Sequence, residues 1–367
     1  MRKFLALLLA ALLLPACAGA SGFLRTVSEP IPQEEQQELT PSDYTGDVRI
    51  TFLGDCTLGG ESPVRYPSLS FEQRIRDNGM DFPFRELRQL TEGDDLTVAN
   101  LEGVLTDRSL QKADKKFVFK GPTAYTEILT LGSVECVTLA NNHSHDYGNG
   151  GYSDTKAALE DAGICWFDTR NSAVWENSEG LRIGFIGVEG SLSGSRYKDF
   201  QKQAKRLKNY GCAAIITVMH AGDEYDYHPP TRYQKQITDR AVPYSDLIIG
   251  HHPHVPQGYT VLDGVPVVYS LGNCVFGGNT RPKDLDALVV QAVLHFTNGK
   301  PDRIDLHFYP ISVTTDDRYN NYSPCFLSGD DAARVLKKMA DSTGNDPGSF
   351  DEVAGAVVSV PINEKKK

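Results

Sequence analysis

Ser245-Asp246-Leu247-Ile248-Ile249-Gly250-His251-His252-Pro253-His254-Val255 is the stretch that says most about both the fold and the chemistry of this chain. The apolar run that ends at Ile249 is typical of a β-strand, and Gly250 marks its end. The three histidines that follow would lie on a loop at the carboxyl edge of a sheet, where open α/β folds bind their ligands. Because neutral imidazole is the commonest metal ligand, this loop is a candidate metal site; the alternative is a His-rich surface turn.

The same order, an apolar strand followed by polar residues, recurs along the chain. Strands are expected at residues 48–53, 96–99, 134–140, 213–219 and 245–249. The polar residues that follow them are Asp55, Asn100 with Glu102, Asn142 with His143, His220, and His252 with His254. In a mostly parallel sheet the carboxyl ends of the strands share one edge, so we expect these residues to meet in one cleft.

The types of donor in this set predict a divalent metal ion. Carboxylate, amide and imidazole ligands without a thiolate set suit a hard or borderline ion such as Mn²⁺, Fe²⁺, Zn²⁺ or Mg²⁺. A carboxylate shared by two ions would give a binuclear centre, and either Asn100 or Glu102 could supply the bridge. Asn100, Asn141, Asp146 and Asn273 are candidates for residues that support the ligands or contact the substrate.

Six blocks stand in order between roughly residues 47 and 315. They read Gly54-Asp55-x-x-Leu58, Ala99-Asn100-Leu101-Glu102-Gly103, Ala140-Asn141-Asn142-His143-x-x-Asp146-Tyr147-Gly148, His220-x-Gly222-x-Glu224-Tyr225, Gly250-His251-His252-Pro253-His254-Val255 and Tyr269-Ser270-Leu271-Gly272-Asn273. Together they resemble the signature of the bacterial capsule synthesis (CapA) family, which is associated with poly-γ-glutamate capsules. That family resembles the calcineurin-like metallophosphoesterases. The resemblance implies an α/β fold, a metallophosphoesterase-like four-layer α/β/β/α sandwich with mixed sheets.

The resemblance also implies roles for individual residues. Asp55 stands where the first metal-binding aspartate sits, Asn142 where an asparagine ligates a metal, and His143 where a histidine assists the transition state. The remaining histidine ligands would be His220, His252 and His254. Thr57 occupies the place of a further histidine ligand, so a single ion or a weakened second site is an alternative. His251 is expected to be a neighbour of the site only.

The N-terminal residues are typical of an export signal. Arg2 and Lys3 precede a short apolar run, and Leu14-Pro15-Ala16-Cys17 resembles a bacterial lipobox. Lipidation of Cys17 would anchor the chain to the bacterial membrane outside the cytoplasm, whereas ordinary cleavage would leave it secreted. We expect residues 1–20 to be the signal, 21–46 a flexible tether, 47–315 the globular domain, and 316–367 a C-terminal extension that packs on that domain and ends in a polar tail.

Composition excludes some functions and leaves others open. The chain has 367 residues and a net charge of −11, which argues against a general nucleic-acid-binding protein. The one basic cluster that we single out is solvated or meets a polyanion; it comprises Arg108, Lys112, Lys115, Lys116 and Lys120. The other six cysteines lie in or near apolar segments and are expected to be buried thiols, with one disulfide as the alternative.

The expected function is that of an extracytoplasmic, metal-dependent protein of capsule or poly-γ-glutamate synthesis. It would hydrolyse, transfer or handle a polyanionic polymer such as poly-γ-glutamate or a cell-surface polysaccharide, with His143 supporting the developing charge. Glu224 is a candidate general acid or base, or a solvated carboxylate. One alternative is a non-catalytic polymer-binding or export factor that works with other membrane subunits of capsule synthesis. Another is a surface phosphodiesterase or nucleotidase.

Overall fold

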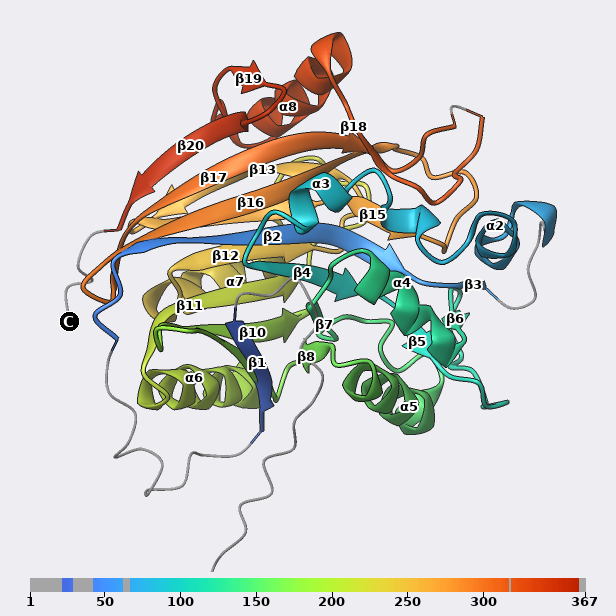
Figure 1. Cartoon of the computed structure of the whole chain (residues 1–367), viewed down its shortest axis with the longest axis horizontal. Coiled ribbons are helices and arrows are strands. Elements are labelled where there is room, and N and C mark those ends of the chain that lie inside the picture. The colour runs from blue at the N-terminus through green and yellow to red at the C-terminus, as the bar shows by residue number, and fades with distance from the viewer. Residues whose placement is uncertain (1–21, 29–41, 62–66, 317, 363–367) are drawn as a thin grey trace, which may run out of the picture.

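Two large β-sheets stacked face to face form the centre of the molecule (Figure 1). The structure is a computed structural model, and it describes residues 22–28, 42–61, 67–316 and 318–362. Buried side chains from both sheets pack between them, including Phe52, Phe185 and Ile249. The α/β class expected from the sequence is confirmed.

The first sheet has seven strands. Their order is β1 (Gly22–Val27), β9 (Ser172–Asn177), β10 (Arg182–Glu189), β11 (Cys212–His220), β12 (Leu247–His251), β14 (Val265–Leu271) and β13 (Pro256–Leu262). β10, β11, β12 and β14 run parallel, whereas β1, β9 and β13 pair antiparallel with their neighbours. The parallel strands carry their polar residues to one edge of this sheet.

The second sheet has ten strands. Its order is β19 (Phe350–Asp351), β20 (Gly355–Pro361), β17 (Lys300–Ser312), β16 (Asp286–Thr297), β2 (Gly46–Thr57), β4 (Leu96–Leu101), β7 (Cys136–Thr138) and β8 (Cys165–Phe167). Two further strands join it beside β2 and β17: β15 (Asn273–Phe276) and β18 (Cys325–Phe326). β2, β4, β7 and β8 run parallel. A small third sheet consists of β3 (Gly60–Glu61), β6 (Phe119–Gly121) and β5 (Val104–Leu105).

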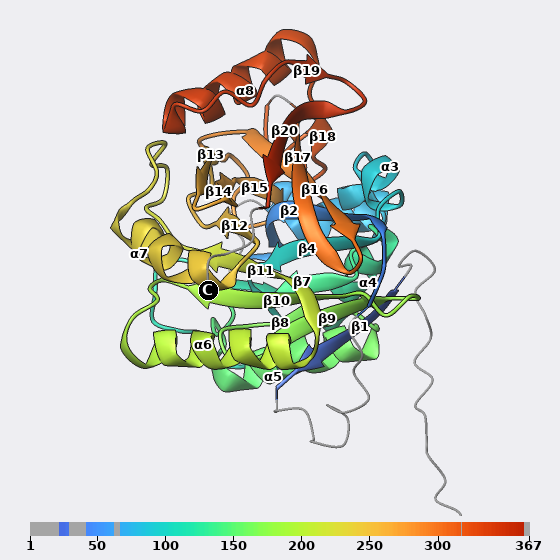
Figure 2. The same cartoon turned by 90° about the vertical axis from the view of Figure 1, so that its left-hand side faces the viewer.

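Helices pack on the outer faces of both sheets (Figure 2). Those on the seven-stranded sheet are α6 (Gly194–Asn209) and α7 (Arg232–Ala241). Those on the ten-stranded sheet are α2 (Phe71–Asn78), α3 (Arg88–Thr91), α4 (Thr126–Leu131) and α5 (Gly148–Asp161). Near the C-terminus α8 (Gly329–Thr343) packs against β13 and β17, and β20 pairs with β17. The short 3₁₀ turns are Pro67–Leu69, Phe82–Phe84, Thr123–Tyr125 and Val242–Tyr244.

The structure corrects one expectation about local structure. Gly22–Val27 is strand β1 and not part of a tether, because it pairs antiparallel with β9. A 3₁₀ turn at Phe82–Phe84 precedes the short helix α3, and α5 begins at Gly148. β16 and β17 extend the sheet of β2.

The remaining N-terminal expectations, the export signal and Cys17, fall outside the described residues. The six cysteines in the described part of the chain are free thiols, and four of them are buried. Among the described residues no helix is long and apolar enough to cross a membrane.

Candidate metal centre

The carboxyl ends of β2, β4, β11 and β12 meet at one place, although these strands belong to two sheets. Asp55 and Asn100 come from the ten-stranded sheet, and His220 and His251 come from the seven-stranded sheet. The expectation that one sheet gathers the site was therefore wrong. The residues meet because the two stacked sheets direct the carboxyl ends of their parallel strands to the same end of the molecule.

Asp55 lies at the centre of a buried hydrogen-bond network. Asn100 Nδ2 donates to Asp55 Oδ1 at 2.7 Å and lies 3.1 Å from His220 Nδ1. Asn141 Nδ2 in turn donates to Asn100 Oδ1 at 2.9 Å. Both ends of the Asn100 amide are therefore engaged by protein groups, which suits a residue that positions ligands and does not suit a bridge between ions.

Glu102 differs from Asn100 in having no hydrogen-bond partner. Its side chain is 0% exposed, and neither carboxylate oxygen has a partner among the described residues. Burial, followed by the negative charge of Asp55, raises the pKa of Glu102 to about 8. A buried carboxylate without partners is costly in a protein interior, and a bound cation would remove that cost.

Glu102 belongs to two donor groups at once. In one group its carboxylate lies with Asp55 and His254, and in the other with His220 and His252; within each group the donor atoms lie within 4.8 Å of one another. This arrangement could hold one or two divalent ions, and it favours Glu102 over Asn100 as the shared ligand. The unpartnered buried oxygens and the donor types both fit a metal ion.

The Asp55 group is held by residues of two loops. His254 Nδ1 lies 3.2 Å from Asp55 Oδ2 and 2.9 Å from Asn273 Oδ1. Burial alone would lower the pKa of His254, but the charge of Glu102 and the hydrogen bond with Asp55 raise this pKa to about 10. Burial would raise the pKa of Asp55, yet its contacts with His251 and His254 hold it well below its usual range.

The His220 group converges on a second point. His220 Nε2 lies 2.7 Å from Asn142 Oδ1, 3.1 Å from His252 Nδ1 and 3.5 Å from Glu102 Oε1. Burial, together with the charge of His252, holds the pKa of His220 well below its usual value. Burial also lowers the pKa of His252. Both imidazoles are therefore in the neutral form that binds metals.

His143 lies beside the shared carboxylate of Glu102, and Asp146 holds the opposite side of its ring. Its Nδ1 lies 2.8 Å from Asp146 Oδ2, and its Nε2 lies 3.9 Å from Glu102 Oε1. Asp146 also accepts a hydrogen bond from the backbone N–H of Phe119 at 2.6 Å and forms an ion pair with Lys115. Lys115 Nζ donates to the Asn142 carbonyl at 2.7 Å. The Nε2 atom of His143 thus faces the centre in a fixed orientation.

The backbone at His252 and His254 has an unusual conformation that sets the direction of their side chains. His252 has φ of 100° and His254 has φ of 58°, values that non-glycine residues rarely adopt. A Cβ atom on Gly250 in β12 would lie 2.0 Å from the carbonyl oxygen of Tyr269 in β14, so only glycine fits at this position. Strain of this kind persists where the surrounding structure enforces it, and it is commonest at functional sites.

Of the other predicted residues, Glu224 and Asn142 lie at the exposed rim of the cluster, whereas His251 lies inside it. Glu224 is exposed on the loop after β11, and its charge contributes to the raised pKa of Glu102, although less than burial, Asp55 and Asp146 do. Asn142 is exposed, so the centre opens to solvent beside it. His251, expected to be only a neighbour, is buried with Nδ1 3.5 Å from Asp55 Oδ1. The sequence carried a signal for this contact. His251 stands two residues after Ile249, and side chains at this spacing in a strand point to the same face, so His251 faces the other sheet as Ile249 does.

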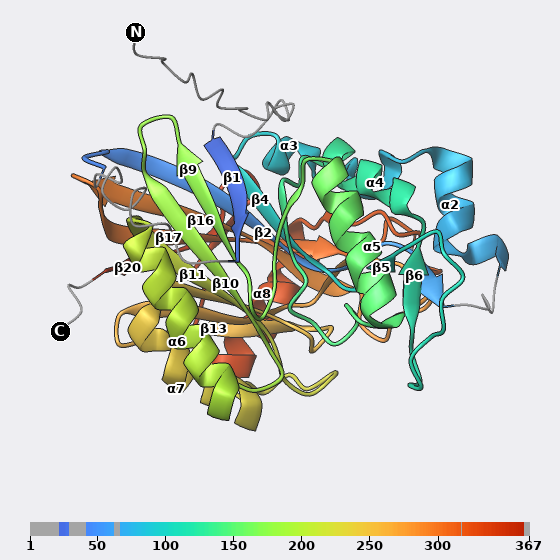
Figure 3. The ribbon, with the colours of Figure 1, turned by 90° about the horizontal axis from the view of Figure 1, so that it is seen from below.

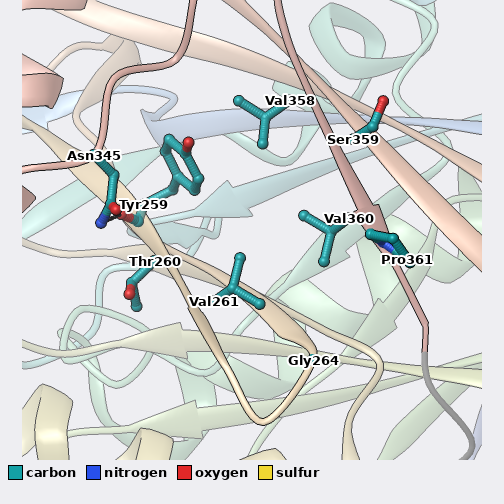
Figure 4. A pocket seen from close by; sticks show the side chains of 9 residues that line it. All are labelled: Tyr259, Thr260, Val261, Gly264, Asn345, Val358, Ser359, Val360 and Pro361. Carbon is teal, nitrogen blue, oxygen red and sulfur yellow. Dashed lines mark hydrogen bonds between the residues drawn. The ribbon is translucent and has the colours of Figure 1, made fainter.

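A separate groove of about 540 Å³ lies between β13 and β20 (Figure 4). The residues that line it include Tyr259, Val261, Asn345 and Val360, and none is an aspartate, a glutamate or a histidine. It therefore lacks the metal ligands and acid–base groups of the cluster around Glu102.

A known protein family matches a large part of this chain. The family described as "Bacterial capsule synthesis protein PGA_cap" matches residues 49–278. The "Capsule biosynthesis protein CapA" of Bacillus anthracis is 28% identical over 282 residues, which cover 70% of this chain and 64% of that protein. The chain thus spans less than two thirds of the length of this relative.

Two further relatives and one solved structure also align with this chain. The "PGA biosynthesis protein CapA" of Bacillus subtilis is 29% identical, with 66% of this chain and 67% of that protein covered. A "Probable polyglutamine synthesis accessory protein" of Mycobacterium tuberculosis is 26% identical, with 60% and 66% covered. A solved crystal structure aligns with 71% of this chain and 99% of its own at 12% identity, but its TM-score of 0.35 does not establish a common fold. From the match over residues 49–278, this chain belongs to the bacterial capsule synthesis protein family.

Proposed function

We propose that this chain is an extracytoplasmic, metal-dependent protein of capsule or poly-γ-glutamate synthesis that hydrolyses or transfers a polyanionic polymer. The single observation that carries the proposal is Glu102, a buried carboxylate without a hydrogen-bond partner that two groups of metal ligands share. The names of the relatives, which refer to capsule and PGA biosynthesis, support the capsule context. The two stacked sheets between helices support a metallophosphoesterase-like fold.

The residues divide into two half-sites and one flanking histidine. Asp55, Glu102 and His254 would hold one ion, and a second would be held by Glu102, Asn142, His220 and His252. Mn²⁺, Fe²⁺, Zn²⁺ and Mg²⁺ all suit such oxygen and nitrogen donors. When bound, these ions would supply Lewis acidity for a carbonyl or phosphoryl oxygen of the substrate.

Besides the metal ions, His143 is the side chain that would act on the substrate. Asp146 and the Phe119 backbone fix the imidazole so that Nε2 faces the shared carboxylate. In that position Nε2 can donate a hydrogen bond to a substrate oxygen as negative charge develops, or protonate the leaving group. Lys115, beside His143 and Asn142, adds a positive charge at the entrance, where an anionic chain would approach.

The experiment combines metal content with turnover. Wild type, Glu102→Gln and the control Glu352→Gln, which lies on an exposed loop, are purified and their metal content is measured by elemental analysis. Each is then incubated with poly-γ-glutamate and with a chromogenic phosphodiester. We expect wild type and Glu352→Gln to carry metal and cleave the polymer, and Glu102→Gln to lose both properties.

Other outcomes identify the alternatives. Cleavage of the phosphodiester alone would make this chain a phosphodiesterase. Polymer binding that requires Glu102 but produces no cleavage would make it a binding or export factor. Metal content unaffected by Glu102→Gln would contradict the site itself.

Attachment to the membrane through Cys17 is a second part of the proposal. A lipidated Cys17 would hold the domain at the outer face of the membrane, near other membrane subunits of capsule synthesis. We expect Cys17→Ser to move the protein from the membrane fraction to the soluble fraction. Unchanged retention in the membrane fraction would rule out this anchor.

A further inference from the structure

Helix α6 carries a positively charged outward face in a protein whose net charge is −11. Its sixteen residues include six basic ones and a single acidic one, Asp199; the basic residues are Arg196, Lys198, Lys202, Lys205, Arg206 and Lys208. Phe200, Ala204 and Leu207 pack inward against the seven-stranded sheet. This distribution gives α6 a basic outer face and an apolar inner face, and the metal centre uses neither.

Three of these lysines form one stripe along the exposed side. Lys198, Lys202 and Lys205 follow one another at spacings of four and three residues, which places them on one face of a helix, and all three are exposed. Lys202 lies 3.6 Å from Asp199. Within the described part of the chain no carboxylate pairs with Lys198 or Lys205. The stripe is therefore available to an anionic partner.

Strand β1 adds an apolar side chain on the same outer face of the sheet. Val27 of β1 packs with the core residues of α6, and Arg206 Nη1 donates to the Val27 carbonyl at 2.9 Å. Because side chains alternate along a strand, Phe23 points to the same face as Val27, and Phe23 is 62% exposed. Figure 3, a view from below, shows α6 in front of the sheet whose edge is β1.

The N-terminal sequence brings this face close to the predicted anchor. Only four residues separate Cys17 from Gly22, the first residue of β1. Fully extended, that connection spans on the order of 18 Å. A chain lipidated at Cys17 therefore keeps its β1 edge within reach of the lipid headgroups, so that a basic face beside that edge can come into contact with anionic lipid.

We propose that the outward face of α6, with Phe23 of β1, is a docking surface for an anionic lipid membrane. The lysines contact lipid phosphates, and the Phe23 ring enters the interface between headgroups and acyl chains. Helix α6 lies alongside the strands, whereas the metal centre lies at their carboxyl ends (Figure 1). A membrane along α6 therefore leaves the centre open beside the bilayer. This orientation goes beyond the proposed activity and does not depend on catalysis.

The test measures binding without the lipid anchor. The full chain with Cys17→Ser is sedimented with vesicles of phosphatidylcholine alone or of an equimolar mixture of phosphatidylcholine and phosphatidylglycerol. A lysine near an anionic surface contributes roughly a five-fold increase in binding, so Lys198→Gln, Lys202→Gln and Lys205→Gln together should lower binding to the mixed vesicles roughly 100-fold. Phe23→Ala should weaken binding further.

A second triple variant controls for net charge. Arg76→Gln, Lys300→Gln and Lys337→Gln remove the same charge from α2, β17 and α8. We expect this control to bind the mixed vesicles nearly as well as the parent, and all variants to retain the parent's circular dichroism. The proposal would be overturned if both triple variants lost the same amount of binding to the mixed vesicles. It would also be overturned if the parent did not bind them, or bound neutral vesicles equally well. Binding of free poly-γ-glutamate through these lysines without vesicle binding would overturn it too.

Discussion

At the scale of single residues, the centre is built at the expense of stability in the metal-free protein. Glu102 and Asp55 are both completely buried, and neither Glu102 oxygen has a hydrogen-bond partner among the described residues. Close carboxylates disfavour ionisation of one another, which is part of the reason that the pKa of Glu102 is raised, after burial. Such a cluster is stable only if protons or cations offset its charge.

The variant Glu102→Gln tests this cost. A neutral amide of the same shape removes the unpartnered charge, so the metal-free variant should be as stable as wild type or gain on the order of 1 kcal/mol. Wild type should gain about 2.7 kcal/mol when a divalent ion is present at 100 times its dissociation constant, and the variant should gain far less. Thermal melts with a chelator and with added Mn²⁺ measure both effects. A variant that gains as much from Mn²⁺ as wild type would show that Glu102 does not bind the ion.

His251 is predicted to position Asp55. Its Nδ1 lies 3.5 Å from Asp55 Oδ1, the same oxygen that accepts a hydrogen bond from Asn100. Loss of a residue that supports a metal ligand typically lowers metal affinity 10–100-fold, and we expect about this loss at the Asp55 half-site in His251→Phe. His251→Gln, which keeps a donor, should restore part of it. Calorimetric titration measures the affinities, with His228→Phe on an exposed loop as the control; equal affinities in His251→Phe and the control would count against the role.

At the scale of secondary-structure elements, the site depends on how closely β12 approaches β14. Gly250 allows this approach because a Cβ atom there would meet the Tyr269 carbonyl oxygen at 2.0 Å. The two strands are parallel neighbours, and β12 ends at His251. The spacing of these strands therefore also sets where the loop with His252 and His254 begins.

The variant Gly250→Ala should separate the two strands. Overpacking of this kind costs about 1–3 kcal/mol, and the displaced loop should also lower the metal content. Gly93→Ala is the matched control, because the nearest atom to its new Cβ lies 3.4 Å away, an ordinary contact. Urea unfolding gives the free energies of unfolding, and elemental analysis gives the metal content. A Gly250→Ala protein as stable as Gly93→Ala would mean that the strands can adjust at little cost.

At the scale of the whole molecule, two buried carboxyl groups at the amino ends of β4 and β7 make stability depend on pH. Burial raises the pKa of Glu135 to about 8 and the pKa of Asp94 to about 7. Glu135 Oε2 accepts a hydrogen bond from the Thr97 backbone at 2.9 Å. Both folded-state pKa values lie above the unfolded values. Their contribution to stability is therefore complete below the unfolded pKa and is lost as pH rises through about 7 and about 8.

The variant Glu135→Gln isolates this contribution. The amide oxygen can accept the same hydrogen bond but cannot ionise, so the variant should lose less stability than wild type between mildly acidic pH and pH above 8. Urea midpoints of both proteins across this range supply the comparison. Parallel pH profiles for the two proteins would show that Glu135 does not titrate in the folded state as expected.

The sequence by itself determined the class of the fold and the identity of most of the buried cluster. Alternation and β-branched residues are local properties, so the strands around Ile50, Val98, Ile216 and Ile249 could be predicted from their own residues. Polar residues directly after such strands, such as Asp55 and His220, could be recognised for the same reason.

Only the tertiary structure decided how these pieces meet. It divided the site strands between two stacked sheets, placed Gly22–Val27 in a sheet, and distinguished Glu102 from Asn100 by the partners that each has in space. It also brought His251 to Asp55, although 196 positions separate them in the chain. Such contacts depend on the packing of distant segments, and local sequence patterns carry no information about which distant partner a buried side chain will find.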